Sequence, residues 1–398
     1  MNFLPPTGFK IAVAASGLSH VARGIEGWAL ETAGALSRAG EDVTLFQGSG
    51  TEVSPTRETL GCVLRSDPTA IKWSRRLQRM GLWRLGLSST YDFEQFTFTW
   101  PLWKRIRRDF DILHVQDPME ALWMTKLRRL GLSRPRVILG HGTEETPAWL
   151  RQYEVLQHLA PVYLEEWEAH RPPGQMVYAI PNFIDVNRFR RPEMGDRAAA
   201  RAEWGIPQDA FVVLSVAALK KTHKRVDYLI REFQAFQKSD PRPALLLVAG
   251  AREPGTAEIL ELGSRLLGDR ARMLINVPRE KITGLYQAAD VFAIASLHEM
   301  MPMVVIEAMA SGLPVCCNDT PTLRWMAGPC AEPNRIDREG ALAEQLRRLF
   351  SVEERQRRSL LARQRAEDLF SEAAVVPQLQ AMYREVILNA GGTPPGSG

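Results

Sequence analysis

The chain has 398 residues, more than one hydrophobic core usually organises, so two α/β domains are the expected arrangement. Hydrophobic residues make up 45% and charged residues 24%, which is typical of a folded globular protein and excludes a disordered one. The formal net charge of +4 is too small to indicate nucleic acid as a partner. No apolar run reaches the roughly 18 residues of a membrane span, and the N-terminus lacks the pattern of a signal peptide.

The first half of the chain alternates short apolar segments of strand length with helical patterns. We predict strands at 10–15, 42–46, 112–115, 137–140 and 177–180, and helices at 25–38, 119–129 and 146–158. Strand–helix–strand units of this length predict a parallel sheet with right-handed crossovers. The sequence therefore predicts a doubly wound, Rossmann-like domain over residues 1–178.

The alternation restarts after a polar, Arg- and Pro-rich segment at 182–195. We predict strands at 211–216, 244–249, 273–276, 291–295 and 314–317, and helices at 227–238, 258–267, 304–310 and within 338–369. A second Rossmann-like domain is expected over 179–372, followed by a helix over 373–390 that packs back on the first domain and a disordered tail over 391–398. Two such domains are expected to face across a cleft at the carboxyl ends of their sheets, where open parallel sheets bind ligands.

A basic, tryptophan-rich stretch interrupts the first domain between residues 65 and 136. It holds 15 Lys or Arg against 7 Asp or Glu, and five of the chain's ten tryptophans. The segments 73–86 and 100–108 mix aromatic and cationic residues as helices on a membrane surface do. The alternative is that the tryptophans pack in the core while the arginines stay solvated. Peripheral membrane contact through Trp73–Arg108 is therefore one of two interpretations.

Two glutamates with seven residues between them mark the segment 293–317, AIASLHEMMPMVVIEAMASGLPVCC. Glu299 follows a predicted strand, and Glu307 lies inside a helix that begins near Pro302, because proline fits a first helical turn. A helix N-terminus favours an anion such as a diphosphate, and a carboxylate can accept hydrogen bonds from a ribose diol. On spacing alone, two ordinary surface glutamates are an equal alternative.

The whole segment resembles the E-x7-E segment of glycosyltransferase family 4, a family of retaining enzymes with the GT-B fold. The family pattern is close to S-x-x-E-G-F-G-x-x-x-x-E-A-M-A-x-G-x-P-V. Four other segments resemble family patterns in the same order along the chain: 23–36 (RGIEGWALETAGAL), 111–118 (DILHVQDP), 179–189 (AIPNFIDVNRF) and 287–293 (QAADVFA). The resemblance extends from about residue 10 to about residue 320 and implies a GT-B fold of two Rossmann-like domains.

The resemblance implies roles for individual residues. Glu307 matches the family glutamate that holds the donor's ribose hydroxyls, and Glu299 matches the one that contacts the donor sugar. Lys224, in SVAALKKTHKRVDYLI, matches a lysine that contacts the diphosphate. His141 matches a histidine near the reacting centre. Gly24 matches a glycine of the first-domain loop that approaches the donor phosphates.

The sequence departs from the family pattern before Lys224. The family arginine of V-G-R-L falls on Ala218, and this segment is one residue longer. Lys220 or Lys221 could supply the missing charge, because a diphosphate leaving group needs electrostatic stabilisation more than a particular fork geometry. The alternative is that these lysines belong to a solvated loop; of the two, we choose Lys220 as the donor-site candidate.

Two further departures concern glycines. The Gly-Phe-Gly after the first family glutamate is Met300-Met301-Pro302 here, and proline removes one amide donor. The amides of Met303 and Val304 remain as phosphate contacts at the helix start. The first-domain Gly-Gly is Arg23-Gly24, and Arg23 is a candidate contact to the acceptor or to the donor phosphate.

The resemblance implies a retaining transfer of a sugar from a nucleotide-sugar donor to an acceptor hydroxyl. We interpret the chain as lacking an Asp-x-Asp pair, the usual carboxylates for a nucleotide-bound divalent metal. No metal and no cofactor are therefore expected. The acceptor is a sugar, a lipid-linked compound or another small molecule, with His114 as a candidate on the acceptor side. We expect a cytoplasmic protein, either free or attached to the inner face of the membrane.

Two other functions stay open at this point. A sugar-nucleotide 2-epimerase shares the architecture and would consume the donor without an acceptor. A non-catalytic protein that only binds sugar nucleotides would also fit, given the missing arginine and the altered Gly-Phe-Gly loop.

Overall fold

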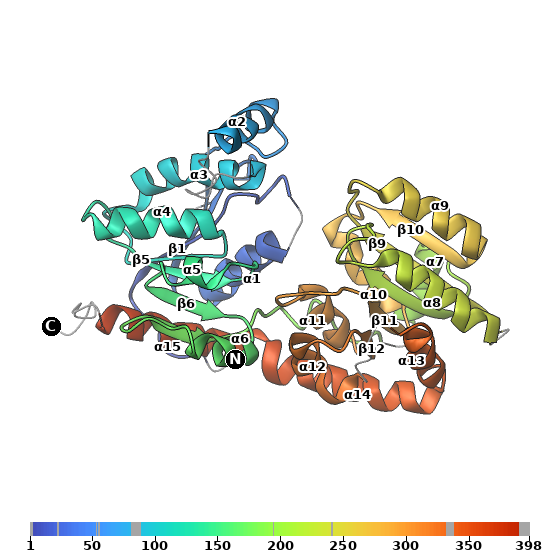
Figure 1. The fold of residues 1–398 in the computed structure, drawn as a ribbon. Helices are drawn as coiled ribbons and strands as arrows, with labels where there is room; N and C mark the ends of the chain where they lie inside the picture. The colour runs from blue at the N-terminus through green and yellow to red at the C-terminus, as the bar shows by residue number, and fades with distance from the viewer. Residues whose placement is uncertain are drawn as a thin grey trace. The chain divides into compact units, whose positions relative to one another are not determined.

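The computed structural model describes residues 3–21, 24–52, 54, 56–80, 89–193, 195–239, 242–331 and 338–389. It divides into two compact units, Met1–Phe183 with Glu372–Gly398 (unit 1) and Ile184–Ser371 (unit 2) (Figure 1). The boundary predicted at residue 178 lies five residues before this division. The predicted helix 373–390 is observed as α15 (Glu372–Leu388), and it belongs to unit 1. The tail predicted at 391–398 lies outside the described residues.

Unit 1 is built on a seven-stranded sheet in the order β3-β2-β1-β4-β5-β6-β7. The strands are β1 (Lys10–Ala15), β2 (Asp42–Gln47), β3 (Arg57–Thr59), β4 (Ile112–Val115), β5 (Arg136–His141), β6 (Val155–His158) and β7 (Met176–Ala179). All of these neighbours pair in parallel. The strand order reverses between β1 and β4, as in a doubly wound sheet, where ligands bind beyond the carboxyl ends.

Helices cover both faces of this sheet. They are α1 (Gly24–Arg38), α2 (Pro68–Arg79), α3 (Thr90–Ile106), α4 (Pro118–Arg129), α5 (Pro147–Leu150) and α6 (Pro161–Glu168), with α15 added from the end of the chain. Successive residues of β1 point to opposite faces. Ile11 and Val13 join the cluster formed with α1 and α15, while Ala12 and Ala14 join the one formed with α3 and α4.

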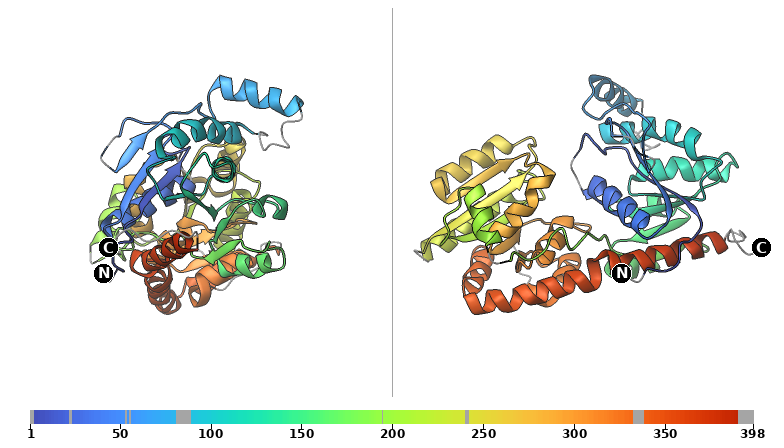
Figure 2. Two further views of the ribbon diagram at one scale, coloured as in Figure 1. Left: turned by 90° about the vertical axis from the view of Figure 1, so that its left-hand side faces the viewer. Right: turned by 180° about the vertical axis from the view of Figure 1, so that it is seen from behind.

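The C-terminal helix is part of the unit 1 core. Val376 and Tyr383 of α15 are fully buried in the cluster that includes α1. Gln380 exchanges hydrogen bonds with both backbone groups of Leu4, so the start of the chain lies beside this helix (Figure 2). The last residues of the chain therefore complete the first domain.

One element of unit 1 was predicted wrongly. The helical pattern over 146–158 contains only the short helix α5, and Val155–His158 form strand β6. All four residues of β6 are buried between β5 and β7. A strand this short carries no local signal that separates it from a buried helical turn, so pairing on both sides decided its conformation.

Unit 2 is a five-stranded parallel sheet in the order β10-β9-β8-β11-β12. Its strands are β8 (Phe211–Val216), β9 (Ala244–Gly250), β10 (Ala271–Ile275), β11 (Val291–Ile294) and β12 (Val315–Cys317). Its helices are α7 (Asp196–Glu203), α8 (Val226–Ser239), α9 (Thr256–Leu267), α10 (Ile282–Ala288), α11 (Met303–Ala310), α12 (Pro321–Ala327), α13 (Ala341–Leu349) and α14 (Val352–Phe370), with short 3-10 turns at Gly268–Arg270, Arg279–Lys281 and Gly328–Cys330. Helices α8, α9 and α13 share one apolar cluster with the sheet.

A buried aspartate fixes the start of β11. Asp290 accepts hydrogen bonds from the Val212 amide at 2.9 Å, from Arg201 at 2.8 Å and from Arg197 at 2.6 Å. The aspartate of the QAADVFA segment therefore joins β8, β11 and α7, and its role in this structure is architectural.

None of the described helices is long and apolar enough to cross a membrane.

Candidate functional site

Two predicted site residues of unit 2 meet at the carboxyl edge of its sheet. Lys224 lies on the loop between β8 and α8, and Glu299 lies on the loop between β11 and α11. Although 75 residues separate them, the Lys224 Nζ donates a hydrogen bond to Glu299 Oε1. Their side chains are only 21% and 12% exposed, so water screens the pair weakly. The Leu297 amide donates to the His223 carbonyl at 2.7 Å, which fastens the two loops to each other.

The backbone around Lys224 is held in unusual geometry. A Cβ placed on Gly250, at the end of β9, would lie 1.8 Å from the Ala217 carbonyl oxygen, so only glycine allows this approach. Arg225, next to Lys224, has a φ of +48°, a region that residues with a side chain rarely adopt. Such strain persists where the surrounding structure imposes it and often marks functional loops.

Helix α11 begins beside Glu299 with its first amides uncapped by a side chain. Pro302 precedes the helix, which has no acidic residue in its first turn. The amides of Met303 and Val304 therefore form the positive end of the helix dipole, where an anion is favoured. Both residues keep the donor capacity predicted for them despite Pro302.

Glu307 lies one turn inside α11 and is held by a tyrosine from a different helix. The Tyr286 hydroxyl, on α10, donates to Glu307 Oε2 at 2.7 Å. The Tyr286 side chain is fully buried, and its ring packs against Phe189 and Phe292 with centroid distances of 5.7 and 6.1 Å. Burial and the nearby Glu307 carboxylate raise the pKa of Tyr286 well above its usual value, so this hydroxyl stays a donor. The sequence analysis missed Tyr286, because nothing local links it to a residue 21 positions away.

The two candidate lysines before Lys224 differ in environment. Lys221 is exposed, and its Nζ donates to Glu258 on α9. Lys220 is half-buried, and its backbone closes the loop by accepting from the Val226 amide at 3.2 Å. Lys220 therefore stays the candidate for the missing family arginine, since Lys221 is exposed and its side chain extends to α9.

In unit 1, His141 ends β5 and lies next to a second histidine. His141 Nδ1 is 3.0 Å from Nδ1 of His158, the last residue of β6, and both side chains are buried. Its Nε2 lies 3.5 Å from Glu145 Oε2. Burial lowers the pKa of His141 to about 4, so the ring is neutral at pH 7. His158 had no signal in the sequence, because its strand was predicted as part of a helix.

The other candidate residues of the first domain, His114, Gly24 and Arg23, differ in location and burial. His114 is fully buried, and its Nδ1 bonds the Tyr383 hydroxyl at 2.8 Å. The prediction of an acceptor-side role for His114 is therefore corrected: the side chain belongs to the core between β4 and α15. Gly24 is exposed at the first position of α1, where an added Cβ would meet no other atom. Arg23 lies outside the described residues.

The prediction that the chain lacks an Asp-x-Asp motif is wrong, because one occurs at Asp109-Phe110-Asp111. Asp111 lies just before β4, at the amino end of the sheet, and accepts from the Lys10 amide at 2.9 Å and from Arg134 at 2.6 Å. The triplet therefore serves strand and loop contacts away from the carboxyl edge. Across the described ranges, no group of three or more His, Cys, Asp or Glu has metal-ligand geometry.

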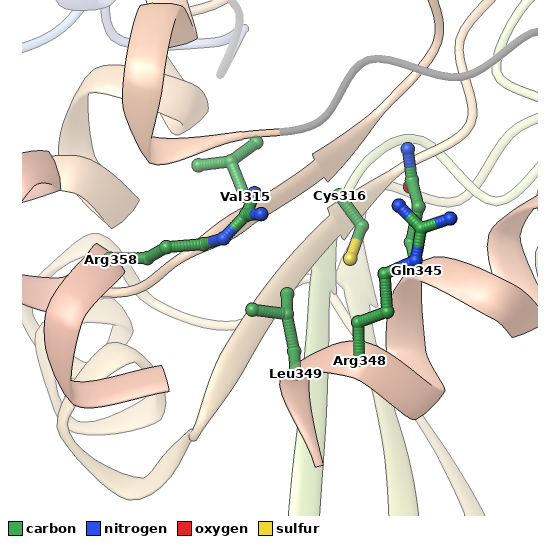
Figure 3. A pocket seen from close by; sticks show the side chains of 6 residues that line it. All are labelled: Val315, Cys316, Gln345, Arg348, Leu349 and Arg358. Atoms are coloured by element: carbon green, nitrogen blue, oxygen red, sulfur yellow. The ribbon is translucent and has the colours of Figure 1, made fainter. Parts of the chain in front are cut away.

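A small pocket in unit 2 lies apart from these residues (Figure 3). It is lined by side chains from β12, α13 and α14: Val315, Cys316, Gln345, Arg348, Leu349 and Arg358. Neither the lysine loop nor the Glu299 loop contributes to it, so it is not the donor-site candidate.

Two family models match the chain. The model for glycosyltransferase family 4 matches residues 22–188, and the model for glycosyl transferases group 1 matches residues 196–363. Among curated proteins, the D-inositol 3-phosphate glycosyltransferase of Nocardia farcinica is 36% identical over 146 residues, which are 35% of this chain and 32% of that protein. The chain thus matches about a third of the length of this relative.

Solved structures resemble the whole chain. The sucrose-phosphate synthase of Thermosynechococcus elongatus has a TM-score of 0.75 at 19% identity, covering 98% of this chain and 100% of its own. Anabaena HepE in complex with UDP and glucose has a TM-score of 0.71 at 14% identity, covering 95% and 100%. These likenesses show the fold, which is the GT-B arrangement of two parallel-sheet α/β domains.

Proposed function

This chain belongs to glycosyltransferase family 4, and we propose that it transfers a sugar from a nucleoside-diphosphate sugar to an acceptor hydroxyl. The transfer retains the donor's anomeric configuration and needs no metal ion. The observation that carries the proposal is the pairing of Lys224 with Glu299 beside the N-terminus of α11. A cation, a carboxylate and free helix amides at one sheet edge are suited to a sugar diphosphate.

Each group at this edge has a chemical task. As the bond to the anomeric carbon breaks, negative charge grows on the leaving diphosphate. Lys224 and the amides of Met303 and Val304 stabilise that charge, which is the effect that most often dominates catalysis of such transfers. Glu307 accepts hydrogen bonds from the ribose diol, and Glu299 accepts from the sugar hydroxyls.

Retention and metal independence have separate support. Glu299 and Glu307 match the signature of a retaining family and lie on one helix and the loop that leads into it. A lysine and helix amides supply positive charge where other transferases use a divalent cation. In unit 1, His141 at the end of β5 would contact the reacting sugar from the first domain.

A donor screen by thermal shift tests the proposal. UDP-, GDP-, ADP- and dTDP-sugars are added to the wild type and to Glu307→Ala, in EDTA and in magnesium. We expect one donor class to raise the melting temperature of the wild type, equally with and without EDTA, and to have no effect on the variant. If the variant responds like the wild type, or if stabilisation requires magnesium, the donor site or its metal independence is wrong.

The same preparation separates transfer from the alternatives. A transferase releases nucleoside diphosphate only when an acceptor is present, whereas a 2-epimerase converts the donor alone. The acceptor panel includes simple sugars, lipid-linked sugars and a phosphorylated cyclitol, the last because the matching relatives are D-inositol 3-phosphate glycosyltransferases. The anomeric configuration of the product, read by NMR, tests retention.

Peripheral membrane contact is proposed through α2. Every cation of this helix is exposed, and so are Ile71 and Trp73, at 38% and 41%. A basic face with exposed aromatic and aliphatic side chains suits an anionic lipid surface. Cosedimentation with vesicles containing phosphatidylserine is expected to fall strongly in the triple variant Arg75/Arg76/Arg79→Ala. The control is the double variant Arg265/Arg270→Ala, which removes two exposed arginines from α9 and the turn that follows it. An equal fall in cosedimentation for this variant would contradict a specific role of α2.

A further inference from the structure

His141 and His158 form a buried pair that has no counterpart among the described residues of unit 2. They are register partners at the ends of β5 and β6, and their Nδ1 atoms are 3.0 Å apart. The rings meet edge to face, with centroids 5.1 Å apart. His141 is 7% exposed and His158 is 1% exposed, so both rings are shielded from water.

Burial makes this pair neutral. It lowers the pKa of His141 to about 4 and that of His158 to about 3, and His141 further disfavours charge on His158. A neutral imidazole carries one proton, on Nδ1 or on Nε2. A hydrogen bond between two Nδ1 atoms therefore requires one ring to be the Nδ1–H tautomer and the other to be the Nε2–H tautomer.

Glu145 decides which ring has which tautomer. Its Oε2 lies 3.5 Å from Nε2 of His141, while its Oε1 accepts from the Thr143 hydroxyl at 2.6 Å. Burial raises the pKa of Glu145 to about 6, so the carboxyl is mostly ionised at pH 7. A carboxylate oxygen facing Nε2 favours a proton on that nitrogen. Among the described residues neither ring's Nε2 has a hydrogen-bond partner, so the Glu145 carboxylate 3.5 Å from the Nε2 of His141 is what distinguishes the two rings.

We propose that His158 is a positioning residue that donates from Nδ1 to Nδ1 of His141 and so keeps the proton of His141 on Nε2. The proposal rests on the proposed function, in which His141 contacts the reacting sugar. With Nδ1 occupied and Nε2 protonated, His141 donates a hydrogen bond to a sugar oxygen and cannot take a proton there. His141 is then a binding donor and not a general base.

Besides His158 and Glu145, the His141 ring meets the backbone of Thr143, which opposes the lowering of the His141 pKa. The Tyr163 ring lies 6.2 Å from the His141 ring, and the Trp167 ring lies 6.3 Å from the His158 ring. Charged groups that act on Glu145 are Glu144 and Asp92, both acidic. Both raise the pKa of Glu145, and neither favours a proton on Nδ1 of His141 over one on Nε2.

The first test reads the tautomers directly. Long-range ¹H–¹⁵N spectra of the labelled full chain distinguish protonated from bare ring nitrogens, and His141→Gln and His158→Gln assign the signals. We expect Nε2–H for His141 and Nδ1–H for His158 at pH 7. The reversed pattern, or a charged ring at pH 7, overturns the proposal. This readout does not require turnover, so it separates the proposal from failure of the proposed function.

The second test uses activity. His158→Gln keeps an amide donor near Nδ1 of His141 and is expected to stay within about threefold of the wild-type kcat. His158→Leu removes the donor and is expected to lower kcat about tenfold, the size of one hydrogen bond. In a His141→Ala background, His158→Leu should cause no further loss, because His158 acts through His141.

Two outcomes of the activity test contradict the proposal. One is an equal loss in the Gln and Leu variants, and the other is a further loss in the His141→Ala background. Thermal unfolding of each variant shows whether a loss reflects folding. If His158→Leu does not fold, the tautomers of the wild type and the His158→Gln variant still decide the question.

Discussion

Polar side chains beyond the carboxyl ends of the strands differ in charge and burial between the two units. In unit 2, Lys224 and Glu299 form an ion pair between two loops. In unit 1, His141, His158 and Glu120 are buried and, at neutral pH, are held in uncharged forms or disfavoured as ions. The loops of unit 2 thus hold an ion pair, whereas the ends of β5 and β6 in unit 1 hold a neutral histidine pair.

The difference follows from chain geometry. In unit 2, Lys224 and Glu299 are 21% and 12% exposed, and their mutual ion pair offsets the cost of desolvating the two charges. In unit 1, His141, His158 and Glu120 are at most 7% exposed, and a buried charge without a partner would be expensive. A diphosphate is therefore expected at unit 2, and an uncharged hydroxyl is expected near His141.

The largest expected effect tests the charged edge. Lys224→Ala should lower kcat about 100- to 1,000-fold, because it removes the cation that stabilises the leaving diphosphate. Steady-state kinetics with the donor found by thermal shift measures this. The matched control is Lys221→Ala, an exposed lysine paired with Glu258, which should change kcat less than twofold. A comparable loss in both variants would show that general positive charge, and not the Lys224–Glu299 pair, is what matters.

A smaller effect is expected from the hydroxyl that holds Glu307. Tyr286→Phe should weaken binding of the nucleoside diphosphate about tenfold, since a charge-assisted hydrogen bond that orients the carboxylate is lost. The loss should be much smaller for the 2′-deoxy nucleotide, which offers Glu307 one hydroxyl fewer. Calorimetric titration of both nucleotides measures the difference.

Tyr228→Phe is the control for this substitution. The Tyr228 hydroxyl faces the Arg338 carbonyl at 3.4 Å, in a different part of unit 2. Its loss should leave nucleotide affinity unchanged. If Tyr286→Phe weakens the ribo- and deoxyribonucleotide equally, Tyr286 supports the fold of α10 and α11 and does not orient Glu307 toward the ribose.

The smallest effect concerns stability and the neutral edge. Glu120, in the first turn of α4, is fully buried, and neither carboxyl oxygen has a hydrogen-bond partner among the described residues. Burial, with the nearby Asp117, raises its pKa well above the usual value. A raised pKa means that the folded state disfavours ionisation of Glu120. The unfolded chain ionises this group above about pH 4.3, so the free energy of unfolding falls as the pH rises above that value.

Glu120→Met should therefore be more stable than the wild type by at least about 1 kcal/mol at pH 8, and the advantage should shrink as pH falls toward 4. Urea unfolding at several pH values measures both. Glu166→Gln, an exposed position on α6, is expected to show no such pH dependence. A Glu120→Met variant that is less stable at pH 8 would contradict the comparison, because it would mean that the buried carboxylate has a stabilising partner.

Several elements were predictable from local patterns. The strands at 10–15, 112–115 and 211–216 have the observed limits because each is a short apolar run bounded by turn residues. The fold class followed from their alternation with helices. The donor-site candidates Glu299 and Glu307 were predictable because they share one segment with a recognisable spacing.

Other features depend on contacts between distant segments, and no local pattern carries them. Strand β6 gained its conformation from β5 and β7, and its pairing is what brings His158 to His141. Tyr286 reaches Glu307 because α10 and α11 pack on one sheet.

The sequence alone thus established two parallel α/β domains, the family resemblance and most of the charged donor-site candidates. Their types and spacing are local properties of a chain. The burial of His114, the partner of His141 and the pairing of Lys224 with Glu299 came from the packed structure. Burial and hydrogen-bond partners are properties of residues that are far apart in sequence, and they exist only when the chain has folded.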